Sequence, residues 1–200
     1  GGSRSAQVAG SAMKDASVKL VEQARATAAR LLEANEADVV LDTDAGSFHV
    51  VGTPAGSVGW AAIAQETGDE PLVAISDFVQ PNSSFPFGAH VSVVEVDLDT
   101  GAVEIQRHVA VDDCGTIVNP LLADGQVHGG LAAGAAQALI EEIRYDENGT
   151  PITSNFADYG VISATELPSF ERIEMVTPSP LNPIGAKGIG ESGTIGATPA

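Results

Sequence analysis

The sequence predicts an α+β fold with mixed antiparallel sheets and two long helices. The clearest strand pair is a hairpin, in which residues 91–96 and 103–111 flank a turn at 97–101 that ends in Gly. Helical spacing of apolar residues predicts the two helices at 11–34 and 121–143. Strands and helices alternate along the chain, but the most distinct strand pair is antiparallel. An α+β arrangement is therefore favoured over a doubly wound parallel sheet.

The first part of the chain contains three further expected elements. Residues 39–41 and 48–51 are rich in β-branched and aromatic side chains and predict two strands joined by a turn. Ser57 is expected to cap a short helix that follows these strands. The helix at 11–34 has charged side chains opposite its apolar face, which is typical of a surface helix packed on a core.

The second part alternates between regular and irregular segments. Residues 68–88 are rich in Pro, Gly, Asn and Ser and predict an irregular connection. The hairpin has apolar residues on both faces, so we expect it to be covered on both sides. Residues 144–150 predict a turn, residues 173–176 a late strand and residues 177–196 a loop. Two sub-lobes, 1–80 and 81–200, are expected.

Composition excludes several classes of protein. The 200 residues are 44% hydrophobic, which is enough to bury a core and argues against disorder. The net charge of -18, with 27 acidic against 9 basic residues, argues against a nucleic-acid partner. We expect no membrane span and a cytoplasmic location. The single cysteine, Cys114, excludes an internal disulfide.

The most informative motif is the glycine-dense stretch 182–196. It contains one lysine, Lys187, and one acid, Glu191. Glycines let main-chain amides approach an anionic ligand, and a single carboxylate in such a loop can act as a general base. The alternative is a flexible surface loop with two ordinary charges. The spacing does not fit a phosphate-binding P-loop, and no convincing strand precedes the loop, so a dinucleotide-binding fingerprint is not supported either.

Three other stretches could contribute to a binding site. Residues 111–120 join a strand to a helix, where polar groups suit an anion. The alternative there is a buried cysteine and an ordinary Asn-Pro helix start. In residues 125–137, Gln126, Gly130 and Gly134 recur every four residues, and this bare helix face admits either a tightly packed neighbour or a bulky cofactor.

The remaining features of these stretches are His128 and the start of the chain. His128 is expected to be a hydrogen-bonded structural histidine, because no second His or Cys stands at ligand spacing, and no metal ligand is predicted. Residues 1–5 combine hydroxyls, a guanidinium and main-chain amides before a helix and would suit a phosphate. The alternative for residues 1–5 is a frayed end.

Taken in order, these stretches resemble the molybdenum-binding large subunit of the xanthine oxidase family, and most of all its carbon monoxide dehydrogenase large-chain branch and the bacterial aldehyde oxidases. The motifs are GGSRS at 1–5, VDDCGTIVNP at 111–120, GQVHGGLAAGAAQAL at 125–139 and GAKGIGESGTIGATPA at 185–200. The resemblance implies that the chain is the C-terminal portion of a molybdopterin-binding domain, a fragment expected to be inactive in isolation.

The resemblance also implies residue roles. Glu191 matches the active-site base. The residues that match cofactor-contacting positions are Gly2, Ser3, Arg4, Ser5, Asp113, Cys114, Asn119, Gln126, Lys187 and Gly188.

The activity implied for the intact enzyme is oxidation of carbon monoxide, an aldehyde or an N-heterocycle with oxygen derived from water. The implied cofactor is molybdenum held by molybdopterin cytosine dinucleotide. In the carbon monoxide branch, copper would bind through a residue outside this chain. The implied partners are the remainder of the large subunit, iron–sulfur and FAD subunits and a small-molecule substrate. Without the resemblance, a non-catalytic scaffold that packs through its glycine-rich faces is the alternative.

Overall fold

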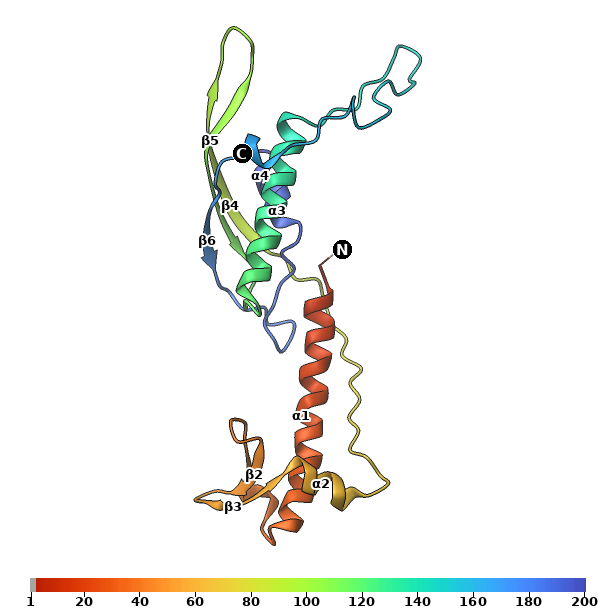
Figure 1. Cartoon of the computed structure of the whole chain (residues 1–200), viewed down its shortest axis with the longest axis vertical. Helices are drawn as coiled ribbons and strands as arrows, with labels where there is room; N and C mark the ends of the chain where they lie inside the picture. The colour runs from red at the N-terminus through yellow and green to blue at the C-terminus, as the bar shows by residue number, and fades with distance from the viewer. Residues whose placement is uncertain (1–2) are drawn as a thin grey trace. The chain divides into compact units, whose positions relative to one another are not determined.

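The computed structural model describes residues 3–200 and divides into two compact units (Figure 1). The small unit consists of residues 9–79. The large unit combines the start of the chain, through Val8, with residues 80–200. The sub-lobes expected from the sequence were 1–80 and 81–200, so the start of the chain is grouped differently in the structure.

The small unit is a three-stranded antiparallel sheet packed on a long helix. Its strands follow the order β1-β2-β3. The turn between β1 and β2 forms because the Asp42 carboxylate accepts hydrogen bonds from the main-chain N–H groups of Asp44 and Ala45, and Gly46 supplies a left-handed φ of 64°. The elements are α1 (Ser5–Leu31), whose first residues through Val8 belong to the large unit, a 3₁₀ turn (Glu36–Asp38), β1 (Val39–Asp42), β2 (Ser47–Val50), β3 (Thr53–Gly59) and α2 (Trp60–Thr67).

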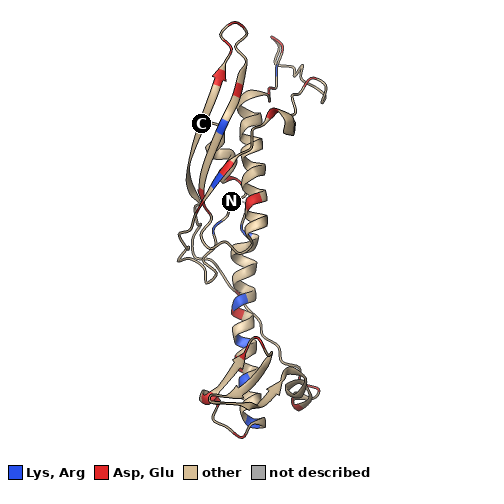
Figure 2. Cartoon of the chain, turned by 60° about the vertical axis from the view of Figure 1, so that its left-hand side comes forward, with Lys and Arg blue, Asp and Glu red and all other residues tan. Residues whose placement is uncertain are grey.

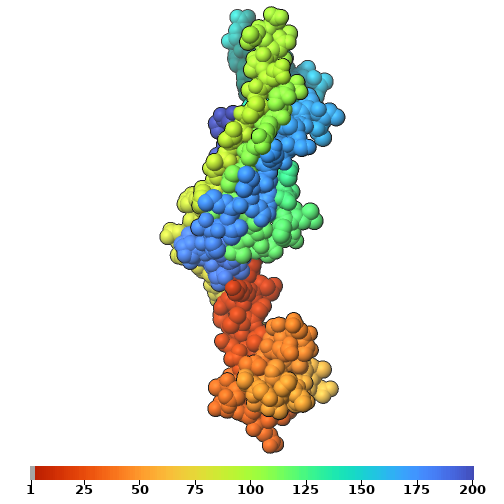
Figure 3. Space-filling view, turned by 90° about the vertical axis from the view of Figure 1, so that its left-hand side faces the viewer, coloured from red at the N-terminus to blue at the C-terminus, as the bar shows by residue number. Residues whose placement is uncertain are grey.

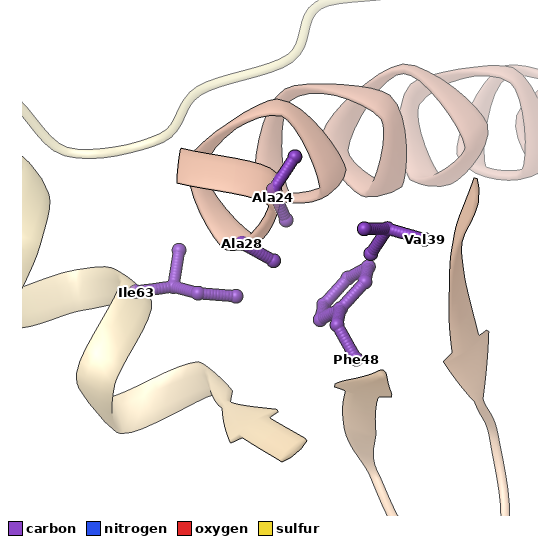
Figure 4. Close-up of a cluster of buried hydrophobic side chains, with 6 residues drawn as sticks. Ala24, Ala28, Val39, Phe48 and Ile63 are labelled. Carbon is purple, nitrogen blue, oxygen red and sulfur yellow. The ribbon is translucent and has the colours of Figure 1, made fainter. Parts of the chain in front are cut away.

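The core of the small unit lies between α1, the sheet and α2 (Figure 4). Ala24 and Ala28 present a flat face of α1 to Phe48 of β2 and Ile63 of α2, and these four side chains are fully buried. The Phe48 ring also meets the Trp60 ring edge-on, with 5.2 Å between the ring centroids. Small residues on the helix thus make room for one large aromatic ring.

The large unit is a mixed three-stranded sheet with two helices on one face (Figure 1). Strand β5 pairs with β4 in antiparallel and with β6 in parallel orientation. The hairpin turn forms because the Asp97 carboxylate accepts from the N–H groups of Asp99 and Thr100. The elements are β4 (Phe87–Val96), β5 (Val103–Asp113), α3 (Pro120–Leu139), a 3₁₀ turn (Ala164–Glu166), β6 (Glu171–Met175) and α4 (Ser192–Ala197).

The bare face of α3 is filled by α4. A Cβ added to Gly130 would lie 3.0 Å from Gly193 Cα, and one added to Gly134 would lie 2.7 Å from Ala197 Cβ. The two helices therefore approach within main-chain contact. Of the two readings of the glycine stripe, the tightly packed neighbour is the one that the structure shows at these two positions.

The opposite face of the large unit's sheet is uncovered (Figure 3). Val91 is 62% exposed, Val93 is 52% exposed and Ile173 is 54% exposed. The expectation that this sheet is covered on both sides is wrong for the described residues. The α3–α4 pair covers one face, and these exposed side chains show that no other segment of residues 3–200 covers the reverse.

The remaining expectations agree with the structure in kind but differ in extent. An α+β fold with mixed sheets and two long helices is confirmed. The sequence missed β3, which contains Ser57, the residue expected to cap the short helix; Gly59 occupies the N-cap of α2 instead. It also missed α4, which begins within the loop expected at 177–196 and ends at Ala197. Both missed elements are rich in glycine, which propensity counts against regular structure.

Basic residues gather on α1, whereas acidic residues are spread over both units (Figure 2). Among residues 3–200, no helix is both long and apolar enough to cross a membrane.

The core of the small unit gives a first prediction. Replacing Phe48 by Ala removes a fully buried ring, and we expect this to lower the free energy of unfolding by about 3–5 kcal/mol. Chemical denaturation followed by Trp60 fluorescence measures the effect, because Trp60 contacts the deleted ring. Val51→Ala, at a position that is 63% exposed, is the control. A loss below about 1 kcal/mol for Phe48→Ala would contradict this core.

Candidate functional site

Two motifs that are distant in sequence pair with each other in the large unit. Gly115 forms an isolated β-bridge with Ala186. The Thr116 N–H donates to the Gly185 carbonyl at 2.9 Å, and the Lys187 N–H donates to the Cys114 carbonyl at 2.7 Å. Gly115 has a φ of 67° and its missing side chain leaves room for the Gly185 carbonyl, so glycine is required there. The strand-end motif thus holds the glycine-rich loop directly.

A buried ion pair joins the same two segments. Lys187 Nζ lies 3.1 Å from Asp113 Oδ1, and their side chains are 8% and 0% exposed. The Asp113 oxygen also accepts from the main-chain N–H of Gly115 at 2.7 Å and of Thr177 at 3.2 Å. The Lys187 ammonium lies over the Phe87 ring, 4.6 Å from its centroid. These contacts fix the loop to the ends of β4 and β5.

Burial pushes the pKa of both titratable neighbours in this motif upward, but the net shifts have opposite directions. Burial alone raises the pKa of Asp113, but hydrogen bonds from Thr177, Gly115 and Lys187 outweigh it and hold that pKa below its ordinary value. Burial raises the pKa of the Cys114 thiol. Asp113 is therefore a stable anion, whereas Cys114 is a thiol kept protonated.

A chain of buried amides anchors the start of α1 to the glycine-rich loop. Gln80 Nε2 donates to Gln7 Oε1 at 3.2 Å, and Asn182 Nδ2 donates to Gln80 Oε1 at 3.3 Å. Asn182 also bonds the main chain of Ala186 in both directions, at 2.9 and 3.1 Å. The three amide side chains are at most 7% exposed. Such satisfied buried networks specify one arrangement of the segments they join.

The start of the chain lies against the glycines next to Glu191. The Gly190 N–H donates to Ser3 Oγ at 3.2 Å. A Cβ added to Gly188 would lie 2.7 Å from Ser3 Cβ, and one added to Gly190 would lie 3.2 Å from Gln126 Oε1. The first, third and last of the four motifs therefore meet around Ser3.

A cavity of about 370 Å³ opens beside this contact. Its wall is built entirely within the large unit. It combines the start of α1, the segment before β4, the inner face of β4 and β5, and the glycine-rich loop with α4. The lining residues are Ser3, Arg4, Gln7, Gln80, Ser83, Ser84, Phe85, Pro86, Phe87, Gly88, His90, Asp112, Gly188, Glu191, Ser192, Ile195 and Gly196.

Glu191 stands at the edge of this cavity as the N-cap residue of α4. Its side chain is exposed and makes no capping hydrogen bond, so its carboxylate is available to a ligand. Its carbonyl accepts from the Ile195 N–H at 3.1 Å, which closes the first turn of α4. Arg4 lines the same cavity, so the wall offers a carboxylate and a guanidinium to one bound molecule.

The structure brings together some of the sequence-predicted site residues and separates others. Ser3, Arg4, Gly188 and Glu191 line the cavity, and Gln126 lies beside it at Gly190. Ser5 is the first residue of α1, and Asn119 caps α3 by accepting from the Leu122 N–H at 3.2 Å.

The other predicted residues lie away from the cavity wall or outside the described part of the chain. Asp113, Cys114 and Lys187 form the pairing described above. Gly2 lies outside the described residues. His128 bonds the Asp124 carbonyl at 2.9 Å, as expected of a structural histidine, and no cluster of metal-ligating side chains is found among residues 3–200.

Sequence reasoning missed the amide chain and a histidine–aspartate pair, His90 and Asp112. His90 interrupts the apolar alternation of β4, and Asp112 directly precedes Asp113, a predicted cofactor-contacting residue. These two features were the only sequence signals that could have indicated the pair. Gln7 and Gln80 give no such signal, because Gln7 precedes the helix expected at 11–34, Gln80 lies in the irregular connection expected at 68–88, and a glutamine in either place is ordinary.

Comparison with known proteins identifies a family model and several relatives that match this chain. A family model described as molybdopterin cofactor-binding domain matches residues 1–168. The carbon monoxide dehydrogenase large chain of Afipia carboxidovorans is 42% identical over 99% of this chain and 25% of its own length. The nicotine 6-hydroxylase large subunit of Paenarthrobacter nicotinovorans is 35% identical, over 100% of this chain and 25% of its own.

A solved structure of the Cu,Mo-CO dehydrogenase superposes with a TM-score of 0.89 at 40% identity, over 98% of this chain and 25% of that chain. The chain therefore belongs to the molybdopterin cofactor-binding domain family, and its resemblance to the carbon monoxide dehydrogenase large chain is confirmed. It spans about a quarter of the length of these relatives.

The buried ion pair gives a second prediction. Asp113→Asn leaves the Lys187 ammonium buried without a counter-charge, and we expect a loss of about 3 kcal/mol of unfolding free energy. Because the folded pKa of Asp113 is depressed, its stabilisation is present above the unfolded pKa of about 4 and is lost as the pH falls through the folded value. The difference from wild type should therefore shrink in acid.

Urea unfolding at pH 7 and at a series of lower pH values measures this difference. Asp99→Asn, at an exposed position in the hairpin turn, is the matched control. A constant difference down to pH 2, or none at pH 7, would show that the Asp113 carboxylate does not stabilise the fold.

Proposed function

We propose that the chain forms one wall of the molybdopterin site in a molybdenum hydroxylase large subunit and supplies its general base, Glu191. One observation carries this proposal: a single cavity gathers Glu191, Arg4 and Ser3 from opposite ends of the sequence. Support also comes from the relatives, which are named as the large chains of a carbon monoxide dehydrogenase and a nicotine 6-hydroxylase. Oxidation of carbon monoxide, an aldehyde or an N-heterocycle is the proposed reaction class.

The donor set of the cavity fits a phosphorylated pterin cofactor. The Arg4 guanidinium and the Ser3 hydroxyl stand at the N-terminus of the 27-residue helix α1, where phosphate oxygens are favoured. Ser83 and Ser84 extend the polar rim, and Phe85 and Phe87 supply flat apolar surface for a ring system. We propose the cytosine dinucleotide form of the cofactor for this rim.

The chain's own part in the reaction is binding, exclusion of water and proton transfer. When bound, the molybdenum centre supplies the redox chemistry. The Glu191 carboxylate accepts a proton from the attacking group, since it is exposed to the cavity and not engaged in capping α4. The Ser3–Gly190 hydrogen bond and the Asn182 amide hold the loop that carries it.

For the whole protein, we propose assembly of the large subunit with iron–sulfur and FAD subunits that take the electrons onward. In the carbon monoxide branch a copper ion would bind outside this chain. We propose a cytoplasmic location for the assembled enzyme.

A non-catalytic scaffold is the second candidate. The observation that favours it is the α3–α4 contact, where protein rather than ligand fills the glycine stripe. The two candidates differ in cofactor content, because a scaffold retains no molybdopterin.

Replacing Glu191 by Gln tests the catalytic role. We expect turnover in the intact enzyme to fall by roughly 10²–10⁴-fold while bound molybdenum is unchanged, because the amide keeps the shape but cannot accept the proton. Steady-state kinetics and metal analysis measure the two quantities. Glu104→Gln, on the exposed part of β5, is the control. Near-normal turnover would remove Glu191 from the mechanism.

Replacing Arg4 by Gln tests the cofactor site separately. Losing a charge-assisted hydrogen bond to phosphate is expected to weaken cofactor retention by roughly tenfold or more. The cytosine nucleotide released per subunit after acid treatment reports occupancy. Arg30→Gln, at the far end of α1, is the matched control. Equal nucleotide content in both variants would contradict the placement of phosphate at Arg4, and absence of nucleotide from the wild-type protein would favour the scaffold.

A further inference from the structure

A buried histidine–aspartate pair forms part of the cavity wall and has no role in the function proposed above. His90 on β4 and Asp112 on β5 lie diagonally across the strand pair. His90 Nε2 faces both carboxylate oxygens, at 3.3 and 3.4 Å. The two side chains are 3% and 2% exposed. The contact between Nε2 and the buried Asp112 carboxylate holds this edge of the imidazole ring in one orientation.

The free edge of the His90 ring faces α4. Its Nδ1 atom is buried and has no hydrogen-bond partner. A Cβ added to Gly196 would lie 2.5–2.7 Å from the ring atoms. Only a glycine fits at 196, so the main chain of α4 rests directly on the ring. Glu191 is the N-cap residue of α4, so the position of the His90 ring under Gly196 also affects the position of Glu191.

A second buried histidine supports the first from the side. His108 meets His90 edge-on, with 5.4 Å between ring centroids, and its Nδ1 lies 2.6 Å from Ser92 Oγ. Burial lowers the pKa of His108, the His90 charge lowers it further, and Asp112 opposes both effects. Asp112, His108 and Gly196 thus enclose the His90 ring on three sides.

We infer that His90, held by Asp112, is a positioning residue for Glu191: its ring is the support on which α4 rests at Gly196. This inference rests on the proposed function for the role of Glu191. The positioning itself is a property of the chain and has its own readout. The inference predicts an energetic coupling between the His90 ring and Gly196. Gly196→Ala should destabilise α4 when the ring is present and stabilise it when the ring is absent.

The experiment is a double-mutant cycle read by hydrogen exchange. In the cofactor-loaded large subunit, we follow the amides of Ile195 and Thr198, which bond to the Glu191 and Thr194 carbonyls. Gly196→Ala alone forces α4 off the ring, and we expect exchange to quicken at least tenfold. Helix propensity by itself predicts the reverse, because Ala favours a helix over Gly.

In a His90→Ala background the ring is absent and the added methyl group has space. Exchange in His90→Ala alone should be faster than wild type, and adding Gly196→Ala should slow it. His128→Ala, which removes an exposed ring that bonds within its own helix, is the control background, in which Gly196→Ala should still quicken exchange. His90→Ala and Gly196→Ala should each lower kcat at least tenfold while KM and molybdenum content stay within about twofold, since binding is retained and only the base is displaced.

The opposite results overturn the inference. If Gly196→Ala has the same effect with and without the His90 ring, the two groups are not coupled and His90 does not support α4. If His90→Ala does not fold, Asp112→Asn provides the test, because it keeps the shape but frees the ring. Unchanged exchange at Ile195 and Thr198 in Asp112→Asn then rejects the pair. Near-normal turnover in Glu191→Gln with intact coupling would instead refute the proposed function alone.

Discussion

The position of the glycine-rich loop depends on buried polar side chains that belong to other segments. Glycines at 185, 188 and 190 have no side chains to bury, so hydrophobic packing cannot fix this stretch. Asn182 bonds its main chain, and Lys187 is tied to Asp113. In a low-dielectric interior, such hydrogen bonds and ion pairs are strong and a broken one is costly. The cavity wall therefore has a defined shape despite its flexible composition.

Glycine serves three separate purposes in the large unit. At 130 and 134 it lets α3 and α4 approach each other, which is a packing role. At 188 and 190 it makes room for Ser3, which brings the start of the chain to the cavity. At 196 it makes room for the His90 ring. The sequence pattern alone does not separate these purposes, because a missing side chain gives no information about what occupies the space.

The sequence predicted the elements whose signal is local. The hairpin turn and the first helix follow from Asp97, Gly101 and a 3.6-residue apolar period, and the structure contains both. Strand β3 and helix α4 were missed because tertiary contacts rather than propensity stabilise them: β3 pairs with β2, and α4 packs on α3. For the site, Glu191, Arg4 and Ser3 were predicted through motifs. The amides of Gln7 and Gln80 were missed because their partners lie more than 70 residues away in sequence.

Because Cys114 is buried, the reactivity of its thiol reports local opening of the strand-end motif. It is the only cysteine in the sequence, it is 7% exposed, and its carbonyl holds the Lys187 amide. A thiol whose pKa is raised by burial reacts slowly with electrophilic reagents while the segment stays closed. Its labelling rate is therefore a direct measure of how often the pairing between residues 113–116 and 185–187 opens, and the native chain contains this probe without any added label.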